Sequence, residues 1–263
     1  MKKQVAIIYN GQIRTNPLSV RPHGRGSEIL NSIKEHFLND EFKEEYDYDV
    51  FVSTDNLDVQ AANEFFENRL VNVALWEERK ILHPISSPMP DHSKLYGKFQ
   101  SIDFQGYPSH SNQYHQYYRA SLAYQMIIDY QKKYDYFIII RPDLKFQKSI
   151  LPIFQELENG RKVFMEHNLF SVASFEMIDV YFELAHRYGE FHVNRGDGGN
   201  TCGEYPNFCP MNCNNIKFSS EMQETNCFYY MLEKRGYNPQ EHFFGSVYNG
   251  EDGNRNTYCT LVR

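Results

Sequence analysis

Short apolar runs alternate with amphipathic segments along the first half of the chain. The runs at residues 4–9, 47–53 and 71–76 are too short for ordinary helices and are rich in aromatic and β-branched residues, which predicts strands. After each of these runs, apolar residues recur at helical spacing, in residues 29–38, 61–70 and 114–130 respectively. Strands that alternate with helices in this way pair in parallel, so the pattern predicts an α/β fold.

One run stands out because it ends abruptly. Residues 137–140 are Phe-Ile-Ile-Ile, which suits a strand buried on both faces, and Arg141-Pro142-Asp143 follows directly. Proline lacks a backbone N–H and disfavours the α conformation in the residue before it, so the chain leaves the sheet here. Arg141 and Asp143 therefore follow the carboxyl end of an interior strand, the edge where open α/β sheets bind ligands.

The second half is patterned less regularly. We expect a helix over 148–158 ending near Gly160, a strand over 162–165, a helix capped by Ser174, and a last strand over 242–248. Ser220 and Gln223 have the capping-box spacing of a further helix that ends at Gly236. Residues 83–112 and 189–217 read as long loops, and the Gly- and Asn-rich end reads as a tail.

Length and charge restrict the kind of protein. The 263 residues suit one large domain, or one domain with a smaller appendage, and the net charge of −7 argues against a nucleic-acid surface. No apolar run approaches the roughly 20 residues that span a bilayer, and the N-terminal run is too short for a signal-peptide core. We expect a soluble, cytoplasmic protein.

Four of the five cysteines crowd into one region, at positions 202, 209, 213 and 227. Their spacings match no common zinc pattern. We expect free thiols first, a local disulfide second and a zinc site third.

The loops after the first two predicted strands carry candidate ligand-binding residues. Gly11 lets the backbone turn or approach a ligand closely, and Arg14 suits a diphosphate because a guanidinium binds phosphate oxygens in pairs. Asp55 follows the second strand, where it can accept hydrogen bonds from a ribose or a base. A plain turn at Gly11 and Arg14, and a helix cap at Asp55, explain the same residues without a ligand.

Three segments together resemble a known family. Residues 7–15 (Ile-Ile-Tyr-Asn-Gly-Gln-Ile-Arg-Thr), 49–54 (Asp-Val-Phe-Val-Ser-Thr) and 134–144, with its Arg-Pro-Asp-Leu, resemble GT-A glycosyltransferases that build capsular and other surface polysaccharides in bacteria and large algal DNA viruses. The resemblance implies a GT-A-like, Rossmann-like single domain with a mixed, mostly parallel sheet flanked by helices. Residues 1–146 would be its nucleotide-sugar-binding half and residues 147–263 its acceptor-binding half.

The resemblance also implies a cofactor. Such enzymes hold a divalent metal with Asp-x-Asp, and here Asp143 matches the second Asp whereas Arg141 replaces the first. Our expectation is Mn²⁺ or Mg²⁺ at Asp143, with His242 or His167 as a partner. In the alternative, Arg141 supplies the positive charge and no metal is needed. We group Arg119, near the start of the helix before this strand, with the cofactor-binding residues.

The implied reaction is transfer of a hexose or pentose from a nucleotide-diphosphate sugar to a glycan acceptor. An inverting enzyme needs a carboxylate base, for which Asp197, Glu221 and Glu224 are the candidates, whereas a retaining enzyme can do without one. As structural residues, Asp197 would form a turn and the two glutamates would favour a helix start. A binding module that has lost catalysis is the alternative function. An unrelated nucleotide-binding α/β enzyme is disfavoured because no G-x-G-x-x-G or Walker loop occurs.

Overall fold

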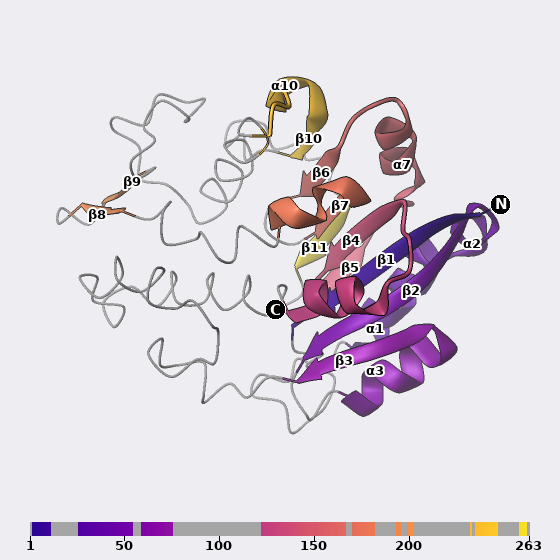
Figure 1. Ribbon diagram of the computed structural model, residues 1–263. Coiled ribbons are helices and arrows are strands. Elements are labelled where there is room, and N and C mark those ends of the chain that lie inside the picture. The colour runs from indigo at the N-terminus through magenta and orange to yellow at the C-terminus, as the bar shows by residue number, and fades with distance from the viewer. Residues whose placement is uncertain are drawn as a thin grey trace.

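A seven-stranded sheet forms the centre of the computed structural model (Figure 1). The structure describes residues 2–11, 26–54, 59–75, 122–166, 170–181, 193–195, 199–201, 232, 235–246 and 258–261. The strands of this sheet, in chain order, are β1 (Lys3–Asn10), β2 (Tyr46–Thr54), β3 (Leu70–Leu75), β4 (Tyr136–Ile140), β6 (Val163–Glu166), β7 (Phe170–Ser174) and β10 (Phe243–Ser246).

The sheet is mixed but mostly parallel, as predicted. Its order is β10-β6-β7-β4-β1-β2-β3, and only β7 runs antiparallel to its neighbours. Six strands therefore end at one edge, which we call the carboxyl edge, and begin at the opposite amino edge. The order also reverses at β1: the chain builds outward to β3 and then returns to place β4 on the other side of β1. One sheet includes strands from both predicted halves of the chain.

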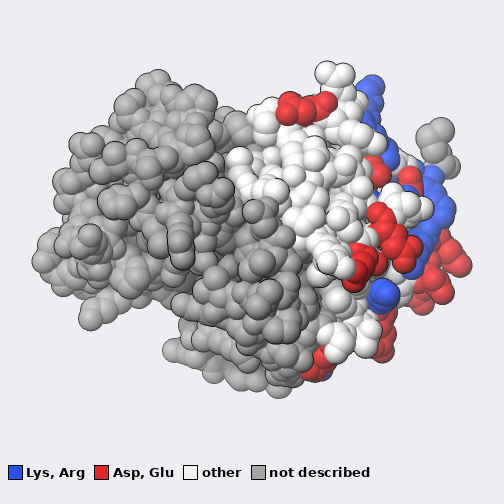
Figure 2. All heavy atoms as spheres, turned by 90° about the horizontal axis from the view of Figure 1, so that it is seen from below, with Lys and Arg blue, Asp and Glu red and all other residues white. Residues whose placement is uncertain are grey.

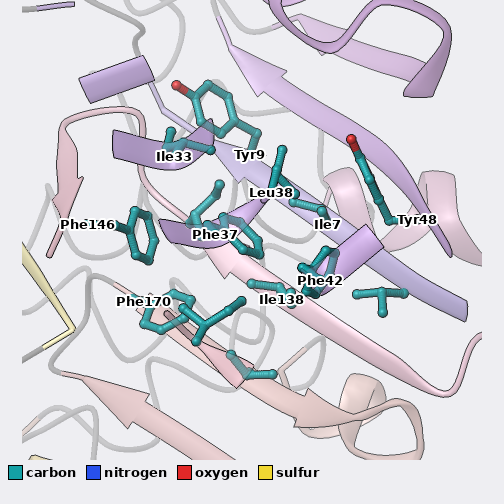
Figure 3. Close-up of a cluster of buried hydrophobic side chains, with 14 of the residues drawn as sticks. Ile7, Tyr9, Ile33, Phe37, Leu38, Phe42, Tyr48, Ile138, Phe146 and Phe170 are labelled. Carbon is teal, nitrogen blue, oxygen red and sulfur yellow. The ribbon is translucent and has the colours of Figure 1, made fainter. Parts of the chain in front are cut away.

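Short helices cover one face of the sheet. They are α1 (Gly26–Ser32), the π-helical turn η1 (Ile33–Phe37), α2 (Asp40–Glu45), α3 (Val59–Phe66) and α7 (Leu151–Glu158), and the short 3₁₀ turn η2 (Glu67–Arg69) joins α3 to β3. Phe37 lies at the centre of the buried cluster that they form with the sheet (Figure 3). Its ring centroid is 5.7 Å from that of Phe42, 5.4 Å from that of Phe146 and 6.5 Å from that of Phe170.

A second buried cluster covers the other face. It packs Ile8 and Phe137 of the sheet against a helix over residues 122–130, the helical residues 178–181 and Leu232. Apolar positions alternate along β2 between the two clusters, because neighbouring residues of a strand point to opposite faces. The described chain is thus a three-layer α/β/α arrangement.

The structure has strands that the sequence analysis did not predict. Residues 170–174 form β7, and Ser174 begins the 3₁₀ turn η5 (Phe175–Met177) without a side-chain cap hydrogen bond. The expected C-terminal tail is wrong: β11 (Cys259–Leu261) pairs antiparallel with β5 (Leu144–Phe146). A hairpin of β8 (Val193–Arg195) and β9 (Gly199–Thr201) lies inside the predicted irregular stretch. These strands are only three to five residues long, so each carries little local signal.

Some smaller differences have simple causes. Leu70, expected in the helix, begins β3 instead. Asn39 caps an extra helix, α2, by accepting a 2.9 Å hydrogen bond from the Phe42 amide. The loop at 83–112, the helix predicted to begin at Ser220, and the cysteines at 202, 209, 213 and 227 lie outside the described residues. Within the described chain, no helix combines the length and apolarity needed to cross a membrane.

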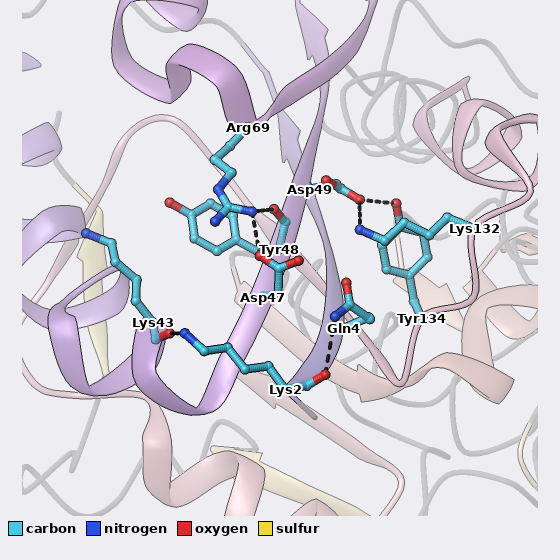
Figure 4. Close-up of polar contacts among 9 residues, drawn as sticks. All are labelled: Lys2, Gln4, Lys43, Asp47, Tyr48, Asp49, Arg69, Lys132 and Tyr134. Carbon is cyan, nitrogen blue, oxygen red and sulfur yellow. Dashed lines mark hydrogen bonds and ion pairs between the residues drawn. The ribbon is translucent and has the colours of Figure 1, made fainter.

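Polar contacts fix the amino-terminal half of β2 (Figure 4). Asp49 accepts hydrogen bonds from Lys132 at 2.6 Å and from the Tyr134 hydroxyl at 2.7 Å, and Asp47 forms an ion pair with Arg69. Seen from below, acidic and basic side chains are interleaved around the α2 end of the molecule (Figure 2). No large patch of a single sign appears on the described part of this face.

Candidate functional site

The ends of three neighbouring strands touch at the carboxyl edge. The Gly11 amide, just past β1, donates a 2.9 Å hydrogen bond to the carbonyl of Ser53 in β2. Gly11 has a φ of +133°, and a Cβ added there would lie 3.1 Å from Cδ of Pro142, which follows β4. Glycine is therefore favoured by both the backbone conformation and the close approach of Pro142.

Arg141 and Asp143 form a bidentate ion pair beside this contact. Arg141 Nε donates to Asp143 Oδ1 at 3.0 Å, and Arg141 Nη2 donates to Asp143 Oδ2 at 2.8 Å. The carboxylate side chain is only 5% exposed, whereas 24% of the Arg141 side chain reaches the surface. Paired donors and paired acceptors fix the plane of the guanidinium as well as its position.

Two buried hydroxyls lie at the end of β2. Ser53 and Thr54 are fully buried, and neither side-chain hydroxyl has a hydrogen-bond partner in the part of the chain that the structure describes. Ser53 is the register partner of Asn10, which is also buried. Buried polar groups almost always have a partner, so these two hydroxyls suit contacts with a bound polar molecule.

A second acid lies at the carboxyl end of β6. Glu166 is buried and accepts hydrogen bonds from the amides of Tyr258, at 2.8 Å, and Cys259, at 3.4 Å. The pKa of the Cys259 thiol is raised well above its usual value, mainly by burial and then by the negative charge of Glu166. The charge of Arg141 lowers this pKa and the charge of Asp143 raises it, both by less. Glu166, Arg141 and Asp143 all act electrostatically on this thiol, so the C-terminal strand β11 lies near all three charged groups.

His242 lies elsewhere. It comes directly before β10, whose first residue, Phe243, pairs with Val163 at the start of β6. Val163 pairs with Ala173 of β7, and Ala173 pairs with Phe137, near the start of β4. His242 is therefore at the amino edge, where its Nδ1 is 3.1 Å from the Gly160 carbonyl oxygen. Asp143 follows the opposite end of β4, so the structure does not bring this histidine and Asp143 to one metal site.

The structure brings together three of the predicted site residues: Gly11, Arg141 and Asp143. The other candidates lie outside the described residues, namely Arg14, Asp55, Arg119, His167, Asp197, Glu221 and Glu224. In the sequence, Asp55 comes directly after β2, and Arg14 comes three residues after Gly11.

The described residues do not fit the expected divalent metal. Among them, no group of three or more His, Cys, Asp or Glu side chains could hold an ion. Both oxygens of Asp143 accept from Arg141, and both oxygens of Glu166 accept from backbone amides.

Sequence reasoning missed three of the residues at this edge. The apolar run over residues 47–53 predicts only that a strand ends near Ser53 and Thr54, although these two residues occupy the same position on β2 that Asn10 and Gly11 occupy on β1. Glu166 comes directly after the predicted strand over residues 162–165, much as Asp143 comes shortly after the apolar run at 137–140. This shared position after a strand was the sequence feature that could have identified Glu166.

No protein-family model matches the chain, and no curated protein sequence is significantly similar to it. Among solved structures, mouse xyloside xylosyltransferase 1 in its apo form aligns at 12% identity over 94% of this chain and 85% of that one, with a TM-score of 0.38. A 4-diphosphocytidyl-2C-methyl-D-erythritol synthase from Anaerococcus prevotii aligns at 8% identity, over 94% and 90%, with a TM-score of 0.38. The mannosyltransferase Ktr4p from S. cerevisiae, in complex with GDP, aligns at 13% identity, over 63% and 40%, with a TM-score of 0.33. Likenesses this distant carry no argument about the chemistry of this chain.

Proposed function

We propose that this protein is a glycosyltransferase that moves a hexose or pentose from a nucleotide-diphosphate sugar to a glycan acceptor. The observation that carries the proposal is the meeting of the ends of β1, β2 and β4 around Gly11, with the guanidinium of Arg141 beside them. In sheets of this kind, ligands bind outside the carboxyl ends of the strands where the strand order reverses.

The positive charge of Arg141 could stabilise the leaving group of the reaction. Cleavage of the sugar–phosphate bond leaves growing negative charge on the nucleoside diphosphate, which fixed positive groups stabilise. The Asp143 pair holds the guanidinium in one orientation before a substrate arrives. Such preorganisation costs no rearrangement during the reaction. We assign Arg14 and Arg119 to further contacts with the donor.

The buried hydroxyls of Ser53 and Thr54 suit the nucleoside part of the donor. An unpartnered buried hydroxyl costs about 1–3 kcal/mol, which a hydrogen bond to a ribose or base would offset. Asp55 follows them directly in the chain, and we assign it to the same part of the donor.

We assign the acceptor to the half formed by residues 147–263, with Asp197, Glu221 and Glu224 as the candidates for a base. The expected product is a surface glycan or a glycoprotein glycan. The Mn²⁺ or Mg²⁺ implied by the sequence resemblance has no ligand set among the described residues, so no step of the proposed reaction is assigned to it.

A sugar-nucleotide-binding protein without catalysis is the second candidate. The observation that favours it is Arg141 in the place of the first Asp of Asp-x-Asp, because loss of that carboxylate is one route to an inactive relative. Such a protein would bind nucleotides at the same edge and release no product.

Turnover separates the two candidates. The purified protein is incubated with UDP-, GDP- and dTDP-sugars and acceptor mixtures, and release of nucleoside diphosphate is measured together with the melting temperature. A transferase releases nucleoside diphosphate from at least one donor, and Arg141→Lys lowers that rate about 10²-fold because the bidentate geometry is lost. Arg161→Lys is the matched control, since Arg161 lies at the amino edge and bonds to the Gln240 carbonyl. No release and no melting shift with any nucleotide would refute both candidates.

A further inference from the structure

We infer that the guanidinium of Arg141 takes the place of a divalent cation, so that this protein binds and uses its donor diphosphate without a metal ion. The inference rests on the proposed function and names the chemistry by which that site would hold its substrate. It departs from the metal dependence that the sequence resemblance implies.

The first observation is how Asp143 is engaged. Its two carboxylate oxygens each accept a hydrogen bond from Arg141, at 3.0 and 2.8 Å, and the carboxylate itself is nearly fully buried. A cation bound to Asp143 would have to share these oxygens and would lie within a few ångströms of a guanidinium that is always protonated. The two positive groups would repel each other in a site where little water screens them. Asp143 is therefore built to hold Arg141.

The second observation concerns the other ligand types at this edge. Glu166 is the further described acid there, and its oxygens accept from the amides of Tyr258 and Cys259. The histidine expected to share the ion, His242, lies at the amino edge. Within the described chain no second carboxylate or imidazole joins Asp143 in a group that could hold an ion.

The third observation is that Arg141 keeps donors to spare. A guanidinium has five N–H groups, of which Asp143 uses one on Nε and one on Nη2; among the described residues, the other three, including both on Nη1, are not used by Asp143. About a quarter of the side chain is exposed, so it can meet a phosphate while Asp143 fixes its plane. Asp143 is a positioning residue in this account.

Formal charge supports the replacement. Two carboxylates and a divalent cation sum to zero, and so do Arg141 and Asp143. The pair of Arg141 and Asp143 therefore has the same net charge as an Asp-x-Asp site with its cation bound, and it reaches that charge without an ion. A guanidinium also binds phosphate oxygens in pairs, which gives the direction that a metal's coordination geometry would otherwise supply.

The test compares metal-free and metal-loaded protein. The protein is stripped with EDTA, and two quantities are measured in EDTA, in Mn²⁺ and in Mg²⁺: the rate of nucleoside diphosphate release from the best donor, and the affinity for that nucleoside diphosphate by calorimetry. We expect both to agree within about twofold across the three conditions. A tenfold or larger loss in EDTA that Mn²⁺ or Mg²⁺ restores would overturn the inference.

The affinity measurement keeps failure of the proposed function separate. Metal-independent binding without turnover under any condition would refute the transferase and support metal-free binding of the diphosphate. Turnover that occurs only with metal would support the transferase and refute the metal-free inference. Absence of binding in all conditions would overturn both.

Variants add a second, independent readout. In EDTA, Arg141→Lys should weaken nucleoside diphosphate binding at least tenfold, while Arg161→Lys at the amino edge should leave it unchanged. Asp143→Asn should weaken binding only a few-fold and create no response to Mn²⁺, because one amide oxygen can still accept from Arg141. Unaltered binding in Arg141→Lys, with an unaltered melting temperature, counts against the inference.

Discussion

Gly11 lies directly against Pro142: a Cβ at position 11 would stand 3.1 Å from the proline Cδ, at a backbone φ of +133°. This contact joins the end of β1 to the turn that carries Arg141 and Asp143. The turn that carries the ion pair is therefore packed against a glycine more than 100 residues earlier in the chain.

We predict that Gly11→Ala lowers the free energy of unfolding by about 1–3 kcal/mol, because a non-glycine residue is strained at this φ and its Cβ crowds Pro142. Urea denaturation measures the change. Gly160→Ala is the matched control, since its φ is +103° but nothing lies within 4 Å of an added Cβ. The control should cost less, and equal losses in the two variants would show that the contact with Pro142 is unimportant.

The hydroxyl of Ser53 should matter for binding and not for stability. Ser53→Ala removes a buried hydroxyl without a described partner, so we expect unfolding free energy to be unchanged or slightly increased. Affinity for the nucleoside diphosphate should fall about 5–10-fold, the value of one hydrogen bond of about 1 kcal/mol or slightly more. Calorimetry and urea denaturation on the same sample separate the two effects.

Ser171→Ala provides the opposite case. Its hydroxyl donates to the Phe164 carbonyl at 2.9 Å and also contacts the Tyr181 hydroxyl. That variant should lose about 1 kcal/mol of stability and keep its nucleotide affinity. If Ser53→Ala behaves like Ser171→Ala, the Ser53 hydroxyl is structural.

Glu166 should hold the C-terminal strand in place. Glu166→Gln replaces one acceptor oxygen by an NH₂ group, so one of the two amides, of Tyr258 or Cys259, loses its partner. A local loss of about 1–2 kcal/mol would expose the buried Cys259 thiol about 5–30 times more often. The alkylation rate of that cysteine, followed by peptide mass spectrometry, should rise accordingly at pH 8.

The control for this variant is Glu158→Gln. Glu158 pairs with Lys3 at the amino edge, whereas β11 pairs with β5, which follows the carboxyl end of β4. Its substitution should leave Cys259 protected, and similar labelling of both variants would point to a general loss of stability.

The ion pair of Asp47 and Arg69 predicts a specific pH dependence. Burial raises the pKa of Asp47, but the hydrogen bond and charge of Arg69 outweigh it, and the net shift is downward. A lowered folded pKa means that the pair stabilises the protein above the unfolded value of about 3.9 and loses this contribution as pH falls through the folded pKa. Because both side chains are about one-third exposed or more, we expect only about 0.5 kcal/mol.

Asp47→Asn should therefore lower the unfolding free energy at pH 7 and have almost no effect near pH 3. Urea denaturation of the variant and the parent at both pH values gives the comparison. A loss that is as large at pH 3 as at pH 7 would mean that the aspartate acts through its shape or its hydrogen bonding, with its charge contributing nothing.

The elements with the clearest periodicity were the ones that the sequence predicted. The apolar run at residues 137–140 became β4, and the helical stripe that includes Phe37 became the centre of a buried cluster. β7 and β11 were not predicted because each is short. β11 pairs only with the distant β5, and β7 lies between the distant β4 and its chain neighbour β6. Pairing between Cys259 and Phe146 leaves no mark in the neighbourhood of either residue.

The candidate site was predictable in position but not in detail. Arg141 and Asp143 follow an apolar strand, and that placed them at the carboxyl edge. The sequence resemblance implies a metal held by Asp143 with His242 or His167, or else a metal-free site in which Arg141 supplies the charge, and neither alternative includes the ion pair between Asp143 and Arg141 that the structure shows. Strand direction decides that point: a residue that precedes a parallel strand lies at the edge opposite to a residue that follows one.

Hydrogen exchange with and without the best nucleoside diphosphate tests most directly whether the donor binds where β1, β2 and β4 end. We predict slower exchange in peptides that cover residues 8–11, 50–54 and 139–144, and no change at the amino edge in residues 132–136 and 159–163. Protection confined to the amino edge, or absent from all three strand ends despite measured binding, would contradict the account.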